Sequence, residues 1–255
     1  MRKILSLILL ISMTTLLCPA QSKVVSYELK KVNGNCTTYN NPQLKKELDK
    51  SKKKLEKRTS VVIGYCPEEM VSEMPQSPLS NFLTDILVEI GNEYCQKKHK
   101  EAVDFSLLNF GGIRSSLKAG NITIGDIFEI APFENNLVIV DLKGSEVRKI
   151  FRRFKVKKCE PYSQQVNIQY AGDYFYKALI NGQEIDNNKT YRMITLDFIL
   201  TGGDDILKDV ELGNVDNTGI VVRDAYIKHI KKMTAEGKNV TGKTDKRMYI
   251  IPQPR

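Results

Sequence analysis

The residues best suited to binding chemistry lie in the stretch 109–135. Arg114 offers a planar fork of donors that fits a phosphate or a carboxylate. Phe133 follows a proline, which stiffens the backbone that carries the ring. Gly111 and Gly112 can adopt positive φ and let a ligand approach the main chain. The same residues also describe an ordinary glycine turn and a core corner, so their spacing alone does not identify a ligand site.

A second stretch runs from Phe198 to Asp204 and places a glycine pair directly before the aspartate. If the two stretches meet in the fold, Phe133 and Phe198 can hold a flat ring between their faces. Asp204 can then accept hydrogen bonds from sugar hydroxyls, while Arg114 takes a phosphate. This set predicts a nucleotide site. The alternative is two unrelated glycine turns with buried phenylalanines.

Periodicity and turn residues indicate the elements that position these stretches. Leucines recur at helical spacing after Ser77-Pro78, which has the form of a helix start. Asn181-Gly182 is a strong hairpin signal. Helices are expected at 44–55, from 77 onward, from 144 onward and at 220–233, and strands at 24–32, 60–65, 105–108, 137–142, 166–170, 191–195 and 248–251. This mixture predicts an α+β domain with a mostly antiparallel or mixed sheet.

The first twenty residues have the pattern of a secretory signal peptide, with Arg2 and Lys3 before a short apolar run and small residues before Gln21. The protein is therefore expected to be exported, periplasmic or outer-membrane-associated; a lipoprotein form through Cys18 is the minor alternative. No other segment is long and apolar enough to cross a bilayer. Residues 21–59 are expected to form an N-terminal extension and 60–255 the main domain.

The formal net charge of +9 and the lysine-rich run at 45–58 raise the question of nucleic-acid binding. No aromatic residues interleave with the lysines, so the run indicates the solvated face of a helix and no nucleic-acid partner. The cysteines outside the leader permit two disulfides in three alternative pairings and match no zinc pattern. They are Cys36, Cys66, Cys95 and Cys159.

The chain resembles the 5′-nucleotidase C-terminal domain, the substrate-recognition half of UshA-like and ecto-5′-nucleotidases, over roughly residues 60–210. Several separated motifs in the family's order are more specific than any one of them. They are Asn109-Phe-Gly-Gly-Ile-Arg114, Gly120-x-Ile-Thr-x-x-Asp126, Pro132-Phe133-x-Asn135, Phe198-x-x-x-Gly202-Gly203-Asp204 and the helix start Leu79-Ser-Asn81-Phe-Leu-Thr-Asp85. The resemblance implies a four-layered α/β/β/α-like domain.

The resemblance also implies a set of nucleotide-binding residues. Phe133 and Phe198 would stack on the base. Asp204 would hold the ribose, and Arg114 would reach the phosphate. Asn109 would meet the base or sugar, and Asn135 would shape the base pocket.

Three departures from the family pattern bear on this expectation. The segment 73–78 lacks the arginine that family members carry just upstream of the helix start, so phosphate affinity is in question. Gln165-Val166-Asn167-Ile168 lacks the usual glycine, and Phe110 stands where a glycine is common.

No catalytic or metal-binding residue is expected in this chain. The metallophosphatase domain of the full enzymes has no counterpart in the sequence, and a dimetal hydrolase needs several closely placed Asp, His and Asn ligands. His99 and His229 are the two histidines, lie in no such motif, and are expected at the surface. Divalent metals are thus expected only on a separate phosphatase chain.

The sequence therefore predicts a domain that binds an AMP-like or adenosine-like ligand and serves as the specificity half of a split 5′-nucleotidase. The alternatives are a binding module with no catalytic partner and a protein-interaction module that has lost the ligand.

Overall fold

The computed structural model describes residues 41–251. The predicted signal peptide, the strand predicted at 24–32 and Cys36 lie outside the described residues. The lysine-rich run forms helix α2 (Pro42–Thr59), none of whose residues is buried. This agrees with the prediction that its charged face is solvated.

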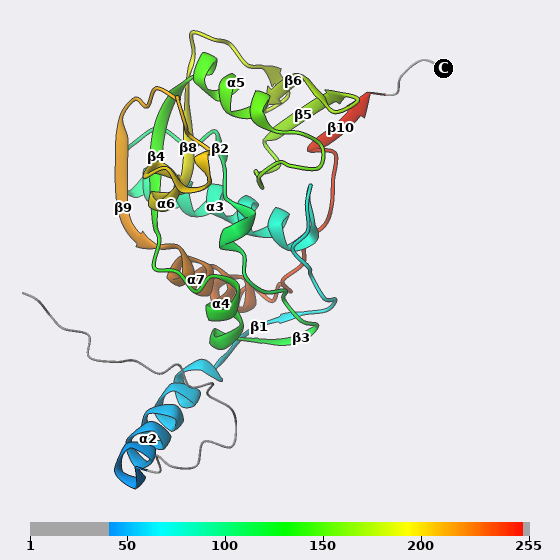
Figure 1. The fold of residues 1–255 in the computed structure, drawn as a ribbon. Coiled ribbons are helices and arrows are strands. Elements are labelled where there is room, and N and C mark those ends of the chain that lie inside the picture. The colour runs from blue at the N-terminus through cyan, green and yellow to red at the C-terminus, as the bar shows by residue number, and fades with distance from the viewer. Residues whose placement is uncertain (1–40, 252–255) are drawn as a thin grey trace, which may run out of the picture. The chain divides into compact units, whose positions relative to one another are not determined.

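Two mixed sheets form the main domain (Figure 1). The first has the strand order β2, β8, β4 and β9, at Phe105–Ser106, Thr190–Leu196, Asn136–Lys143 and Val215–Val221. The second has the order β10, β5, β6 and β7, at Met248–Ile251, Val166–Ala171, Tyr174–Ile180 and Gln183–Glu184. The β2–β8 and β10–β5 pairs are parallel and the other pairs in these sheets are antiparallel. The predicted α+β class with mixed sheets is confirmed.

A short antiparallel ribbon and the helices complete the domain. Strands β1 and β3 span Val62–Cys66 and Gly120–Thr123. The helices are α3 (Pro78–Lys97), α4 (Ile124–Ile130), α5 (Gly144–Arg153), α6 (Asp197–Leu200) and α7 (Val222–Ala235). Helix α5 contacts β4 and β8 of the first sheet and β6 of the second, while α3 contacts β2, β8 and α7. The core thus continues from one sheet to the other through α5.

Helix α3 begins where the sequence indicates. The Ser77 side chain accepts the backbone N–H of Ser80, the Ser80 hydroxyl accepts the backbone N–H of Ser77, and Pro78 occupies the first turn. This reciprocal cap satisfies donors that the first turn leaves unpaired. Leu83 and Leu87 of the predicted apolar face are buried, and Ile90 and Tyr94 are partly buried against the same core.

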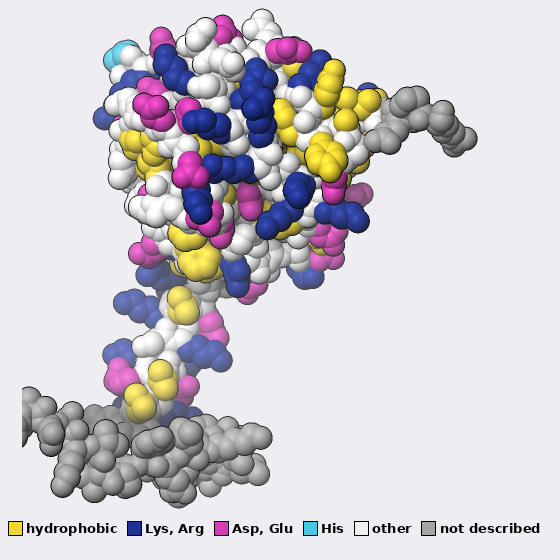
Figure 2. All heavy atoms as spheres, turned by 45° about the horizontal axis from the view of Figure 1, so that its top comes forward, with side chains coloured by type: hydrophobic (Ala, Val, Ile, Leu, Met, Phe, Trp, Pro, Cys, Tyr) yellow, Lys and Arg dark blue, Asp and Glu magenta, His cyan; other side chains and the backbone are white. Residues whose placement is uncertain are grey.

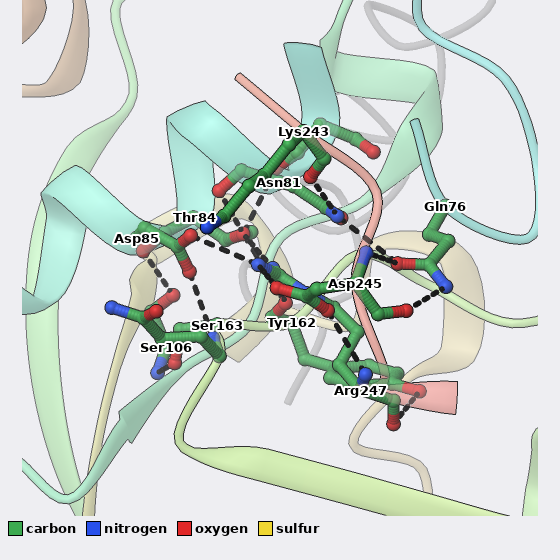
Figure 3. Close-up of polar contacts among 12 residues, drawn as sticks. Gln76, Asn81, Thr84, Asp85, Ser106, Tyr162, Ser163, Lys243, Asp245 and Arg247 are labelled. Atoms are coloured by element: carbon green, nitrogen blue, oxygen red, sulfur yellow. Dashed lines mark hydrogen bonds and ion pairs between the residues drawn. The ribbon is translucent and has the colours of Figure 1, made fainter. Parts of the chain in front are cut away.

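The rest of the helix-start motif binds the C-terminal segment (Figure 3). The Asn81 amide donates to the Lys243 carbonyl at 2.9 Å, and Asp85 accepts from the Arg247 guanidinium at 2.9 Å. Arg247 also donates to Asp245 and to the Tyr162 carbonyl. Since the guanidinium is almost fully buried, this cluster fastens the chain beyond α7 to the start of α3.

One strand was missed, so one predicted helix boundary is wrong. Ile220 lies in β9, which pairs with β4, and α7 begins only at Val222. The sequence Val215-Asp-Asn-Thr-Gly-Ile-Val221 is typical of a turn, because Asp, Asn and Gly are depleted in strands. Pairing with the buried strand β4 overrides that local preference.

The three cysteines in the described part of the chain form no disulfide with one another. Cys66, Cys95 and Cys159 are free and buried. Two disulfides among the four cysteines would require at least one bond among these three, so that arrangement is absent from the described part of the chain.

The prediction that both histidines lie at the surface is half wrong. His99 is exposed, whereas His229, on α7, is 7% exposed. Burial lowers the pKa of His229, although the nearby Glu89 carboxylate, 3.8 Å from its Nε2, opposes that effect. Burial therefore favours the neutral imidazole of His229 in the folded protein.

We expect His229 to make the protein sensitive to acid. The imidazole binds a proton less readily in the folded state, so the free energy of unfolding should fall as the pH drops below the ordinary histidine pKa of about 6.5. One site changes that energy by at most about 1.4 kcal/mol per pH unit. Urea denaturation from pH 7.5 to 5 should show a shallower decline for His229→Gln. His99→Gln is the control, and an equal slope in the wild type and His229→Gln would exclude this role.

Figure 2 shows many Lys and Arg side chains through the middle of one face, with fewer Asp and Glu side chains among and around them and smaller hydrophobic patches beside them. Among the described helices, none combines the length and apolar character needed to span a bilayer.

Candidate functional site

The Asn109 motif follows directly after β2 and forms a tight turn. Residues Phe110–Gly112 make one turn of 3₁₀ helix, closed by the Gly112 N–H donating to the Asn109 carbonyl at 3.1 Å. The expected positive φ at Gly111 and Gly112 does not occur. A side chain is excluded for another reason: a Cβ on Gly112 would lie 2.8 Å from Oδ1 of Asn109. The glycine makes room for the Asn109 side chain.

The two predicted stretches meet in space. The Asn109 amide Nδ2 donates to Oδ2 of Asp204 at 2.7 Å, although the residues are 95 positions apart. Asn109 is buried and Asp204 is exposed. This hydrogen bond links the end of β2 to the loop after β8.

The Gly202-Gly203-Asp204 turn presents both the ring and the carboxylate. Gly202 has φ +98° and Asp204 has φ +55°, so the turn uses left-handed backbone at two positions. A Cβ on Gly203 would lie 2.3 Å from the Phe198 ring. The ring therefore lies directly over the glycine and remains 41% exposed.

The Phe133 ring is held out by a loop that α7 supports. Arg223, 7% exposed, donates to the Pro132 carbonyl at 3.1 Å and to the Glu134 carboxylate at 3.4 Å. Its guanidinium also lies 4.0 Å from the centre of the Phe128 ring. Phe133 itself is 49% exposed, so the loop is fixed while its ring stays accessible. Sequence analysis missed Arg223 because it lies outside the motifs.

A further contact joins the start of β4, which follows the Phe133 loop, to α6, which carries Phe198. The Asn136 amide donates to Asp197 at 2.9 Å, and Asp197 also accepts the backbone N–H of Phe198 at 2.8 Å. Phe133 lies three residues before Asn136, and Phe198 directly follows Asp197. The Asn136–Asp197 hydrogen bond therefore joins the two segments that carry the rings. In the described part of the chain, the rings of Phe133 and Phe198 do not contact each other.

The motif that contains Thr123 and Asp126 is structural. The Asp126 carboxylate accepts the backbone N–H and the hydroxyl of Thr123, and Thr123 accepts the backbone N–H of Asp126. This capping box starts α4. The end of α4 then accepts the Arg114 backbone N–H through the Ile130 carbonyl at 2.9 Å. Arg114 is exposed, and its Nη1 donates to the Gly111 carbonyl at 3.3 Å.

A small apolar cavity of about 20 Å³ lies within this arrangement, enough for roughly one water molecule. Its lining includes Asn109, Gly112, Ile130, Phe133, Asn135 and Tyr226. Oδ1 of Asn109 is buried and has no hydrogen-bond partner. An acceptor at this position can be paired by a water molecule in the cavity or by a donor of a ligand.

The structure brings Asn109, Phe133 and Asn135 to one cavity and connects Asp204 to it through Asn109. Phe198 lies on α6, over Gly203, and Arg114 lies on the loop after Gly112. Among the described residues, no group of three or more His, Cys, Asp or Glu side chains is placed to hold a metal ion.

Two known proteins are similar to this chain in sequence. The chain is 36% identical to protein UshA of Yersinia enterocolitica over 137 residues, 52% of this chain and 25% of that protein. It is 25% identical over 238 residues to the trifunctional nucleotide phosphoesterase YfkN of Bacillus subtilis, 85% of this chain and 16% of that protein. The chain thus spans a quarter or less of the length of these two relatives.

A solved structure supports the same fold. The 5′-nucleotidase precursor of Thermus thermophilus superposes with a TM-score of 0.65 at 22% identity, covering 82% of this chain and 43% of that one. The family described as 5′-nucleotidase, C-terminal domain, matches residues 62–209, more than half of the chain. This chain belongs to the 5′-nucleotidase C-terminal domain family.

Proposed function

We propose that the protein binds a nucleotide or nucleoside, with the base between the faces of Phe133 and Phe198. The observation that carries the proposal is the Asn109–Asp204 hydrogen bond, because it places a buried, unpartnered Asn109 oxygen and an exposed carboxylate on one site. Aromatic faces stack favourably by about 0.5–1.5 kcal/mol beyond the area they bury. Each half-exposed ring here would lose water-exposed apolar surface when a base binds.

Each polar group would bind a different part of the ligand. Asp204 would accept the ribose hydroxyls, the Asn109 oxygen would accept a donor from the base or sugar, and Arg114 would pair with a phosphate. Arg114 is exposed and uses one donor on the Gly111 carbonyl. Its other N–H groups remain available for a bidentate contact with a phosphate. Asn135 contributes to the wall of the base pocket.

The site contributes recognition rather than bond cleavage in this proposal. A metal-bearing phosphatase chain would supply divalent metals and the attacking water, and this chain would fix the base and sugar by binding energy. The family membership and the phosphoesterase relatives support this division of labour. The leader-like N-terminus supports an exported, periplasmic location for the pair.

Calorimetric titration with adenosine and AMP tests the binding proposal. We expect the wild type to bind both and Phe198→Ala to weaken both by about tenfold, the loss of one stacking face and its buried area. Arg114→Ala should weaken AMP more than adenosine, because only AMP carries the phosphate. Tyr174→Ala is the control, since Tyr174 is an 81% exposed aromatic residue on β6.

Two results would contradict the proposal at different levels. Failure of the wild type to bind either ligand removes the nucleotide site and favours an interaction module. If the ligands bind but a cognate metallophosphatase hydrolyses nucleotides no faster when this chain is added, the split-enzyme role fails. The protein is then a binding module without a catalytic partner.

A further inference from the structure

A second carboxylate lies beside the site and belongs to none of the motifs. Oε2 of Glu160 accepts the backbone N–H of Phe110 at 2.7 Å. The next residue, Pro161, accepts the Leu108 N–H at 2.9 Å, so the Glu160 segment runs along the end of β2. Glu160 is half-buried and held in place by these two contacts.

Glu160 and Asp204 bind two consecutive residues of the site. Asp204 binds the Asn109 side chain and Glu160 binds the N–H of the next residue. Burial raises the pKa of Glu160, and the negative charge of Asp204 adds to that effect, while Lys158 opposes it. The two carboxylates therefore hold consecutive residues of the site, and the charge of Asp204 acts on Glu160.

We propose that Glu160 is a specificity-determining residue that, together with Asp204, forms a paired-carboxylate end which accepts the free 2′ and 3′ hydroxyls of a ribose and excludes a ribose whose 3′ oxygen carries a phosphate. The inference rests on the proposed nucleotide site and concerns its sugar end. Free hydroxyls donate hydrogen bonds to carboxylates. A phosphate at the same position has no such donor and brings a charge of about −1.5 to −2 at pH 7.

The neighbouring cations do not remove this repulsion. Arg153 donates to the Ile206 carbonyl at 3.3 Å and lies 3.7 Å from the Asp209 carboxylate, so its guanidinium already has partners. Since Arg153 is engaged elsewhere, Lys158 is the cation that opposes the negative charge at Glu160.

Two ligands that differ by one phosphate test the inference. We would titrate AMP and adenosine 3′,5′-bisphosphate into the wild type, Glu160→Gln and Glu160→Asp. Gln preserves an oxygen for the Phe110 N–H and removes the charge, whereas Asp preserves the charge with a shorter reach. Glu184→Gln, which removes an exposed charge on β7, is the matched control. Thermal melting verifies that each variant is folded.

We expect the wild type to bind AMP at least about tenfold more tightly than the bisphosphate. Glu160→Gln should reduce that ratio roughly threefold to tenfold, as for charges several ångströms apart in partly screened surroundings. Glu160→Asp and Glu184→Gln should largely retain it. Added salt should lower the ratio in the wild type.

Separate results overturn the inference and the proposed function. If the wild type binds the bisphosphate as tightly as AMP, Glu160 has no such role, whatever the variants do. An unchanged ratio in folded Glu160→Gln also overturns it, although AMP binding would leave the nucleotide site intact. If AMP does not bind at all, the nucleotide site and the role of Glu160 fail together.

Discussion

Replacement of Arg247 by methionine should destabilise the protein by about 3–5 kcal/mol, the usual result of removing one partner from a buried ion pair. The Arg247 guanidinium donates to Asp85 at 2.9 Å, to Asp245 at 2.8 Å and to the Tyr162 carbonyl at 2.7 Å. Methionine fills a similar volume but offers no donor. Burial already raises the pKa of Asp85, and loss of the arginine charge should raise it further.

Urea denaturation at pH 7 and at pH 5 measures this effect. When the pKa of Asp85 is higher in the folded protein than in the unfolded chain, its charged form destabilises the fold. That destabilisation decreases as the pH falls and Asp85 becomes protonated. The deficit of Arg247→Met should therefore shrink as the pH falls. Arg247→Lys should also lose stability, because one ammonium cannot reproduce the fork.

Lys177→Met is the matched control, because it breaks an exposed 3.4 Å pair with Glu184. Such pairs contribute about 0–1 kcal/mol. A loss of less than about 1 kcal/mol in Arg247→Met, equal to the control, would show that the cluster does not hold the C-terminal segment to α3.

Replacement of Asn109 by aspartate should abolish measurable nucleotide binding and lower stability by about 1–3 kcal/mol at pH 7. The new carboxylate would face Asp204 at the position where Nδ2 now donates at 2.7 Å. Two carboxylates at this distance repel each other, and one of them takes up a proton with a strongly raised pKa. The loops after β2 and β8 would lose their direct link.

Titration with AMP and urea denaturation across pH 5–8 distinguish this mechanism from simple loss of an amide. The stability deficit should diminish towards pH 5 as the carboxylate pair binds a proton. Asn239→Asp is the control, because Asn239 is exposed and lies outside the site. Binding by Asn109→Asp within a few-fold of the wild type would mean that the Asn109–Asp204 contact does not organise the site.

The sequence by itself determined the local elements and the identity of the motifs. Ser77, Pro78 and Ser80 start α3 through contacts within one turn, and the Asn181-Gly182 turn adopts the positive φ values that such a hairpin needs. These features follow from short-range sterics and hydrogen bonding, which the local sequence contains. The strand predicted at 166–170 is present as β5, and its alternating residues Val166, Ile168 and Tyr170 are buried.

Local patterns did not separate binding residues from structural ones. Thr123 and Asp126 form a capping box, and Asn81 and Asp85 bind the C-terminal segment, although both pairs lie in family motifs. Motif membership alone predicts neither role. The difference lies in which atoms the side chains meet after folding.

The tertiary structure alone decided which distant residues act together. Asp204 meets Asn109 across 95 positions, Arg223 supports the Phe133 loop from 89 to 91 positions away, and Glu160 reaches Phe110 across 50. A buried His229 and the strand β9 were likewise outside the reach of periodicity. Packing against partners far along the chain sets burial, charge environment and pairing, and no local residue pattern carries that information.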